Sequence, residues 1–374
     1  MNTEHPITER IVARAAPWKT LKWRSVLLFA AVALVLPWVL LLAGPGNFFI
    51  HMLIMFFLWS VVAQSWNLVL GVAGIFSLAQ LALFAIGGWT TGVLSLSFGW
   101  NPWVSLMLAP VAATLAALLL GLPILRLRGV YVVLLTLAFS ELLRNYATNG
   151  PQVISGGGYG LNGVPRLSSG LQPTGNNLVF SYYVAFLFFM LATFAIWRIF
   201  HSPVGVAFNA LRDSEAYAIS RGINPYSINL FLFGFSAFFT GLAGGIMTNY
   251  LGSIAPSVFS FSVLVSVLAM IVIGGWGSFG GPILGTALVL SLQEGLRDLS
   301  SYRTLVLGLA LALIAVVAPQ GLWPMLRDSV QRFLDEPQER TEVSEYDPSS
   351  APDPVAAAHV DEKHDGTLDS SSGP

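Results

Sequence analysis

Long apolar runs separated by short polar connections occupy the chain from residue 25 to about residue 325. A helix needs about 20 mostly apolar residues to cross the hydrocarbon core of a bilayer. Ten runs approach or reach that length, and because the fifth and the ninth are the weakest, a count of eight or nine spans stays open. The expected spans are roughly 26–43, 48–70, 80–98, 103–125, 129–143, 178–200, 228–250, 258–275, 281–296 and 304–318.

The composition agrees with a protein that lives in a membrane. Of 374 residues, 55% are hydrophobic and 10% are charged, whereas a soluble domain carries about 25% charged residues. The pattern therefore predicts an all-α, polytopic transmembrane helical bundle. It excludes a disordered body and also nucleic-acid binding, which needs a basic face. The chain has no cysteine, which excludes disulfides, thiolate metal sites and a cysteine nucleophile.

Basic residues set the expected orientation, because cytoplasmic loops of membrane proteins are enriched in Lys and Arg. With ten spans, four basic clusters fall on one side, which places both termini in the cytoplasm; four other arginines fall on the opposite side. The clusters are Arg10, Arg14, Lys19, Lys22 and Arg24 before the first run, Arg126 and Arg128, then Arg198, Arg212 and Arg221, and finally Arg327.

Charge also divides the chain into three segments. Residues 1–24 form a basic cytoplasmic segment, and residues 25–325 form the membrane domain, with a long cytoplasmic connection at about 201–227. Residues 326–374 are acidic, and residues 336–374 carry almost no large apolar side chains, so they cannot bury enough surface to fold. We expect a disordered cytoplasmic tail there.

Several chemistries lack the residues they require. A Walker A loop needs a lysine after its glycines, and none of the three lysines stands in such a loop. No two histidines have metal-ligand spacing. Carboxylates inside the expected spans are nearly absent, since Glu141 and Glu294 fall at their outer ends. This disfavours an ion-coupled secondary transporter, which usually places ionisable groups within the bilayer, and an intramembrane enzyme.

The connection after the sixth run predicts a short capped helix. Asp213 is the expected N-cap, which accepts a hydrogen bond from a first-turn amide. Gly222 suits the left-handed position after the helix, and Pro225 prevents its continuation. Such a helix can dock into a groove of another protein, although the local pattern alone favours a simple amphipathic loop helix.

Two glycine-rich stretches interrupt the apolar pattern, at 65–91 and 273–285. Six glycines in the thirteen positions from Ile273 to Gly285 are incompatible with an ordinary helix, because each interior glycine costs about 1 kcal/mol. Broken helices at membrane depth lie in protein or line a cavity. Ser77 and Gln80 are the polar groups of the first stretch, and helix packing and pathway lining are about equally plausible roles for it.

These stretches carry a resemblance to a known family. Glu215 and Ala216, with Gly222 six residues later, resemble the Glu-Ala-Ala…Gly loop of bacterial ABC importer permeases, with Tyr217 in place of the second alanine. The segment 71–91 resembles the branched-chain amino-acid permeases of the LivM type. The turn at 274–285 resembles that family's Gly-Gly-x-Gly-Ser/Thr-x-x-Gly-Pro-x-x-Gly most closely. The first segment departs from the family at Ile75, Ala79, Gln80 and Trp89.

Three further motifs match in order, at 125–131, 136–141 and 155–161, so the resemblance covers about residues 50–325. It implies a type II ABC importer-like permease and assigns candidate residues to three roles. The ATPase-coupling residues would be Asp213, Glu215, Ala216, Ala218 and Gly222; the translocation path would include Gly71, Gly74, Ser77, Gln80, Glu141, Gly274, Gly275 and Gly277; the outer loop would include Gly156, Gly157, Tyr159 and Asn162.

The resemblance also implies partners and a location, the cytoplasmic membrane of a bacterium or archaeon. The partners would be a second homologous permease, two cytoplasmic ABC ATPase subunits and an extracytoplasmic substrate-binding protein. No cofactor would bind this chain, since ATP and Mg would be used by the ATPases. The substrates would be branched-chain or related amino acids, and a urea or amide permease is the nearest alternative.

Overall fold

The computed structural model divides the chain into two units, residues 1–325 and 326–374. It describes residues 46–127, 129–168 and 177–296, together with position 37 and a few positions between 305 and 323, all in the first unit. The basic segment, nearly all of the run at 26–43, most of the run at 304–318 and the acidic tail therefore lie outside the described residues.

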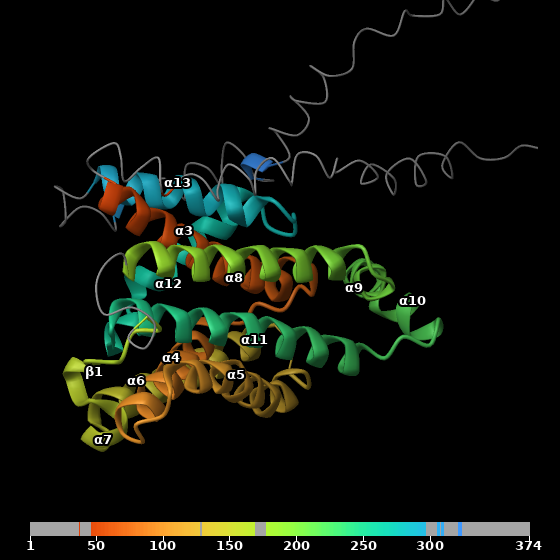
Figure 1. The fold of residues 1–374 in the computed structure, drawn as a ribbon. Coiled ribbons are helices and arrows are strands. Elements are labelled where there is room, and N and C mark those ends of the chain that lie inside the picture. Colours follow the sequence, from red (N-terminus) through yellow and green to blue (C-terminus); the bar gives the residue numbers. More distant parts are fainter. Residues whose placement is uncertain are drawn as a thin grey trace, which may run out of the picture. The chain divides into compact units, whose positions relative to one another are not determined.

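Each of the eight apolar runs expected between residues 46 and 296 forms a helix, and polar or glycine-rich segments connect them (Figure 1). The main helices are α3 (Gly46–Asn67), continued by the π-helix η1 (Leu68–Val72), α4 (Gln80–Leu96), α5 (Pro102–Ile124), α6 (Val130–Asn149), α8 (Asn177–Phe200), α11 (Pro225–Leu251), α12 (Phe261–Gly274) and α13 (Gly281–Gly295). The shorter elements are α7 (Gln152–Ser155), η2 (Gly157–Tyr159), β1 (Leu161–Asn162), α9 (Pro203–Asp213), α10 (Glu215–Ser220), β2 (Ser253–Ile254) and η3 (Pro256–Phe259).

Five of the described helices are long and apolar enough to cross a membrane: α3 with η1, α5, α6, α8 and α11. Helices α4 and α12 are apolar but shorter. One boundary corrects a sequence expectation, because the run expected to end at residue 143 continues to Asn149. At 1.5 Å per residue, Glu141 lies about 12 Å from that end of α6 and not at its outer end.

Short polar side chains begin several helices. Asn101, Ser202 and Asn224 each accept a hydrogen bond from a backbone N–H in the first turn of α5, α9 and α11. A proline follows each of them at the first helical position, where its missing N–H costs nothing. These pairs explain why α5, α9 and α11 begin at the observed residues.

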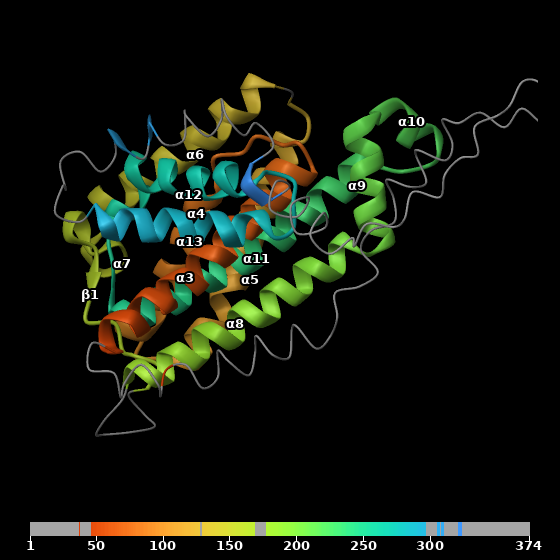
Figure 2. The same cartoon turned by 90° about the horizontal axis from the view of Figure 1, so that it is seen from above.

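Small residues let α4, α11 and α5 approach closely, and the three helices lie side by side (Figures 1 and 2). A Cβ atom at Gly87 would collide with the backbone of Gly241, and one at Gly244 would collide with the carbonyl of Phe84. On the other side of α11, a Cβ at Gly241 would meet the side chain of Ala113 of α5. Close backbone approach through small residues is the usual means of helix association in membranes.

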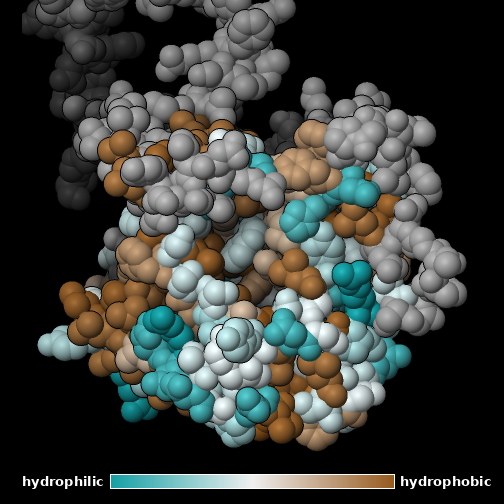
Figure 3. All heavy atoms as spheres, turned by 90° about the vertical axis from the view of Figure 1, so that its left-hand side faces the viewer, coloured by the Kyte–Doolittle hydropathy of each residue, from teal (hydrophilic) through white to brown (hydrophobic). Residues whose placement is uncertain are grey.

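The described bundle has two distinct ends. Helix α10 lies at one end, beyond the C-terminus of α8 and the N-terminus of α11, whereas α7 and β1 lie at the opposite end (Figures 1 and 2). Strands β1 and β2 pair antiparallel, with Leu161 opposite Ile254, which ties the loop after α6 to the end of α11. We call these the α10 end and the β1 end. The face at the β1 end mixes hydrophilic and hydrophobic side chains around a hollow (Figure 3).

Filling the contact between α4 and α11 should destabilise the bundle. We expect Gly87→Leu to cost about 1–3 kcal/mol or more, as overpacking of a tight core does. The measurement is the thermal unfolding midpoint of the purified protein in detergent. Gly295→Leu is the control, since a Cβ at Gly295 meets nothing within 4 Å. Equal midpoints for the two variants would show that this helix contact contributes little.

Candidate functional site

The chain leaves helical geometry between α3 and α4, in the first glycine-rich stretch. The π-helix η1 ends at Val72, and residues 73–79 follow without regular structure. Side chains from neighbouring segments bond the released backbone: Trp66 Nε1 donates to the Ser77 carbonyl at 2.8 Å, and Leu78 N donates to Thr136 Oγ1 at 3.0 Å. Such substitutes are required because the hydrocarbon core offers no water.

The second break lies between α12 and α13, where the sequence predicted that no ordinary helix could form. Residues 275–280 connect the two helices, and Gly275 and Gly277 have φ of 112° and 75°, values that side chains disfavour. Asn67 of α3 bonds this loop through both the oxygen and the nitrogen of its side-chain amide. Gly277 N donates to Asn67 Oδ1 at 2.8 Å, and Asn67 Nδ2 donates to the Ser278 carbonyl at 2.8 Å.

A buried polar chain links three helices just beside the first break. Gln80 Nε2 donates to Ser236 Oγ at 2.8 Å and also to Thr240 Oγ1, and Ser236 Oγ donates to the Ser65 carbonyl at 2.6 Å. These contacts connect α4, α11 and α3. Because buried polar groups are costly unless bonded, the chain fixes how the three helices meet.

The structure shows where the predicted path residues lie. Ser77 and Gln80 are each 1% exposed and hydrogen-bonded inside the bundle, and a Cβ at Gly71 would meet the backbone of Gly277. Gly274 is packed in the same way against Gly281, and Gly275 and Gly277 form the loop that Asn67 holds. Gly74 and Glu141 differ, because both are exposed. In this conformation most of the set lies packed inside the bundle, at or beside the two breaks.

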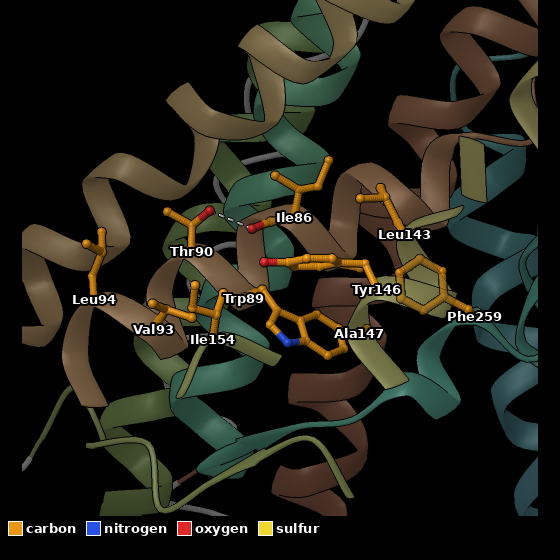
Figure 4. A pocket seen from close by; sticks show the side chains of 11 residues that line it. Ile86, Trp89, Thr90, Val93, Leu94, Leu143, Tyr146, Ala147, Ile154 and Phe259 are labelled. Carbon is orange, nitrogen blue, oxygen red and sulfur yellow. Dashed lines mark hydrogen bonds between the residues drawn. The ribbon is translucent and has the colours of Figure 1, made fainter. Parts of the chain in front are cut away.

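An apolar cavity of about 350 Å³ lies between α4 and α6, towards the β1 end (Figure 4). Trp89, Tyr146 and Phe259 contribute its aromatic walls, and Leu143 and Ile154 contribute aliphatic ones. Two of its polar groups are bonded within the protein: Trp89 Nε1 donates to the Ser155 carbonyl at 3.2 Å, and the Thr90 hydroxyl donates to the Ile86 carbonyl at 2.7 Å.

The predicted short helix exists as α10, with one correction. Its N-cap is Ser214, whose hydroxyl accepts from Tyr217 N at 3.4 Å, whereas Asp213, the expected N-cap, is the last residue of α9. The serine follows α9 directly in extended backbone, and its hydroxyl reaches the first turn of α10. Gly222 does take the left-handed conformation, with φ of 82°.

Within α10 the predicted residues point in different directions. Ala216 is exposed, whereas Ala218 is buried, and its carbonyl accepts from the N–H groups of Arg221 and Ile223 at 3.1 Å. The Arg221 guanidinium bonds the Tyr217 hydroxyl at 2.8 Å and lies over its ring. The connection therefore presents exposed side chains at the α10 end.

The predicted outer-loop residues all lie at the β1 end. Gly156 and Gly157 have φ of 72° and 67° and turn the chain between α7 and η2. Tyr159 is 90% exposed, and Asn162 Nδ2 donates to the Tyr159 carbonyl at 3.4 Å. The loop therefore presents one large aromatic side chain outward.

Sequence reasoning missed the side chains that hold the two breaks together. Asn67, Thr136, Ser236 and Thr240 each stand as a polar residue within an apolar run. That position was a usable signal, since a buried amide or hydroxyl in a membrane bundle needs a partner. Which partner it finds depends on helices far away in sequence, so spacing could not reveal the pairs.

Comparison with known proteins identifies the family. The family described as "Branched-chain amino acid transport system / permease component" matches residues 48–318. The chain belongs to this family. The high-affinity branched-chain amino acid transport system permease protein LivM of Salmonella typhimurium is 31% identical over 350 residues, covering 88% of this chain and 81% of that protein.

Further relatives support the family assignment. The LivM permease protein of Escherichia coli is 33% identical over 296 residues, covering 73% of this chain and 69% of that protein. A ribose import permease protein RbsC of Haemophilus influenzae is 33% identical over 146 residues, 36% of this chain and 45% of that protein. No solved structure matches the chain. With its apolar helices, the chain is a multi-pass permease subunit of the cell membrane and not an enzyme.

The Asn67 link should be essential to the fold of the glycine loop. We expect Asn67→Leu to cost about 1–3 kcal/mol, because the Gly277 N–H and the Ser278 carbonyl would lose their partner in a partly buried place. The measurement is again the thermal midpoint in detergent. Asn149→Leu, at an exposed helix end, is the matched control. If Asn67→Leu and the control had the same unfolding midpoint, other groups would have to bond the Gly277 N–H and the Ser278 carbonyl.

Proposed function

We propose that the chain forms the translocation path for branched-chain or related amino acids in an ATP-driven importer of the cytoplasmic membrane. The LivM relatives support this substrate class by their names. The cavity between α4 and α6 is consistent with it, because about 350 Å³ lies within the range of roughly 300–1,000 Å³ typical of small-molecule sites. An apolar lining suits an aliphatic side chain.

The observation that carries the proposal is the position of α10. An exposed short helix stands at one end of the bundle, between the ends of two long helices, α8 and α11. A displacement of α10 is therefore passed to helices that extend to the β1 end. An ATPase that closes on ATP and presses on Ala216 and its neighbours would shift α8 against α11, which is how a bound nucleotide biases two arrangements of a gate.

The remaining components follow from the same proposal. A second homologous permease completes the path, two ABC ATPase subunits dock at the α10 end, and an extracytoplasmic binding protein delivers substrate at the β1 end. ATP and Mg²⁺ bind the ATPases and not this chain. Both termini and the connection at about 201–227 lie in the cytoplasm, and the complete chain has about ten spans in a type II importer-like arrangement.

A bulky residue on the exposed side of α10 should block ATPase docking. We expect Ala216→Trp to abolish copurification of the ATPases while the permease still inserts into the membrane. Glu215→Arg should act in the same direction by reversing a charge at the docking surface. Val153→Trp is the control, since Val153 is 69% exposed at the opposite end. Normal copurification with Ala216→Trp would refute the docking role.

Reconstituted vesicles separate this proposal from its alternatives. Leucine uptake should require the ATPases, ATP and the binding protein, and a proton or sodium gradient alone should drive none. Uptake by this chain alone, driven by a gradient, would identify a secondary transporter. Urea or an amide that competes with leucine for uptake, or replaces it, would instead point to the alternative permease class.

A further inference from the structure

A polar cavity of about 560 Å³ lies at the β1 end, between the beginnings of α3 and α8 and the end of α11. Its lining differs from that of the apolar cavity between α4 and α6. Five of its seven described lining residues are polar: Asn47, His51, Arg166, Ser181 and Tyr250 line it together with Leu178 and Leu251. The proposed function assigns no role to this cavity.

The backbone fixes the position of the arginine that lines this cavity. Gly163 N and Val164 N both donate to the Gly252 carbonyl, at 3.0 Å and 2.9 Å, which ties the segment after β1 to the end of α11. Val164 and Leu167, on either side of Arg166, are buried, whereas Arg166 is exposed. The arginine is therefore held beside the last turn of α11.

An arginine at this end runs against the expected distribution of charge. The four basic clusters fall on the side expected to be cytoplasmic, and Arg166 falls on the opposite side, where Lys and Arg are less common. A guanidinium group has five N–H donors and no acceptor, so it can bond a ligand as well as groups of the protein. Its planar fork matches the oxygens of phosphate and carboxylate groups.

His51 and Tyr250 supply a further donor. His51 Nδ1 lies 2.6 Å from the Tyr250 hydroxyl oxygen, a hydrogen bond between α3 and α11. If the hydroxyl donates to Nδ1, the ring proton of neutral His51 stays on Nε2; if Nδ1 donates, the hydroxyl proton remains. Either tautomer leaves the pair one N–H or O–H for another acceptor. Asn47 lies one turn before His51 on the same face of α3, and its amide nitrogen can donate as well.

The charge of the cavity is positive. None of the described residues that line it is acidic, and Arg166 is the charged one among them. Glu294 lines a different cavity, of about 220 Å³, which also borders His51. A site with several donors and one positive charge suits an anion, and an ammonium group would find no carboxylate among the described lining residues.

The depth of the cavity brings it to the level of lipid headgroups. Helix α3 with η1 and helix α11 each have 27 residues, which is about 40 Å at 1.5 Å per residue, whereas the hydrocarbon core is about 30 Å thick. Their ends therefore reach the headgroup region. Phe48 and Phe49, next to Asn47, are 39% and 44% exposed, as is common for aromatic side chains at that level. Apolar side chains beside the donors suit a ligand that carries acyl chains.

We propose that this cavity binds an anionic phospholipid: the Arg166 guanidinium and the His51–Tyr250 pair hold its phosphate, and Asn47 and Ser181 bond the rest of its headgroup. One charged group then bridges α3, α8 and α11 at the β1 end. Basic pockets between transmembrane helices bind anionic headgroups in other membrane proteins. The proposal rests on the membrane location of the chain and not on its substrate.

Lipid binding to the purified protein tests the proposal. The complete chain, expressed with its partner subunits, is delipidated in mild detergent. Phosphatidylglycerol, phosphatidylcholine with the same acyl chains, or inorganic phosphate is then added. Native mass spectrometry measures the affinity for each lipid, and the thermal unfolding midpoint shows which ligand stabilises the protein. We expect phosphatidylglycerol to bind about tenfold more tightly than phosphatidylcholine, since one charged hydrogen bond accounts for such a factor.

Asn47→Asp is the central variant, because it keeps the size of the side chain and places a negative charge in the cavity. Asn47 is exposed in the first turn of α3, where an acidic residue suits the helix. We expect Asn47→Asp and Arg166→Gln each to weaken phosphatidylglycerol binding about tenfold. Asn149→Asp, the same change at the exposed β1-side end of α6, is the matched control and should keep the wild-type affinity. If Arg166→Gln unfolds early without lipid, Asn47→Asp decides.

Equal phosphatidylglycerol affinity in Asn47→Asp and in the control would overturn the site. Equal affinity of the wild type for the two lipids would overturn the selection of an anion. If inorganic phosphate raised the midpoint, Asn47→Asp abolished that rise and phosphatidylglycerol had no effect, the cavity would take a soluble anion and the lipid assignment would fall. If leucine uptake fails while lipid binding responds to these variants as expected, the proposed function falls and the lipid site stands.

Discussion

Backbone groups that leave a helix at membrane depth must find partners inside the protein, and the described bundle is organised around that requirement. Two segments, 73–79 and 275–280, break the helical pattern. Trp66 and Thr136 bond the first, and Asn67 bonds the second. Because Trp66 and Asn67 are adjacent in α3, one turn of one helix holds both breaks in place. A displacement of either segment would therefore shift this turn of α3, and with it the other segment.

The bundle combines a tightly packed part with a loosely packed one. Helices α4, α5 and α11 touch through glycine and alanine, so their contact leaves no room for adjustment. Helix α6 has little protein around it, yet its Thr136 and Ser140 bond the backbone of Leu78 at the first break. A partner acting on α6 would thus act directly on the interrupted segment.

The break at 275–280 and the short helix before Gly222 were both predictable from glycine, although Gly274, Gly281 and Gly285 of the same stretch belong to α12 and α13. The exact cap of that helix was not, since Asp213 and Ser214 are adjacent candidates and only the end of α9 decides between them. The roles of Ser77 and Gln80 were likewise open. Their polar side chains suited a pathway or a packed interior, and burial against α11 determined which they occupy here.

The sequence by itself determined the class of protein, the positions of eight helices and the two breaks, because apolar run length and glycine density act locally along the chain. The tertiary structure alone decided which polar groups pair and which helix face stays uncovered. Asn67 meets a loop more than 200 residues away, and Glu141 lies well inside α6 only because the helix continues past the apolar run. Such pairings depend on where distant helices come to lie, which no local pattern encodes.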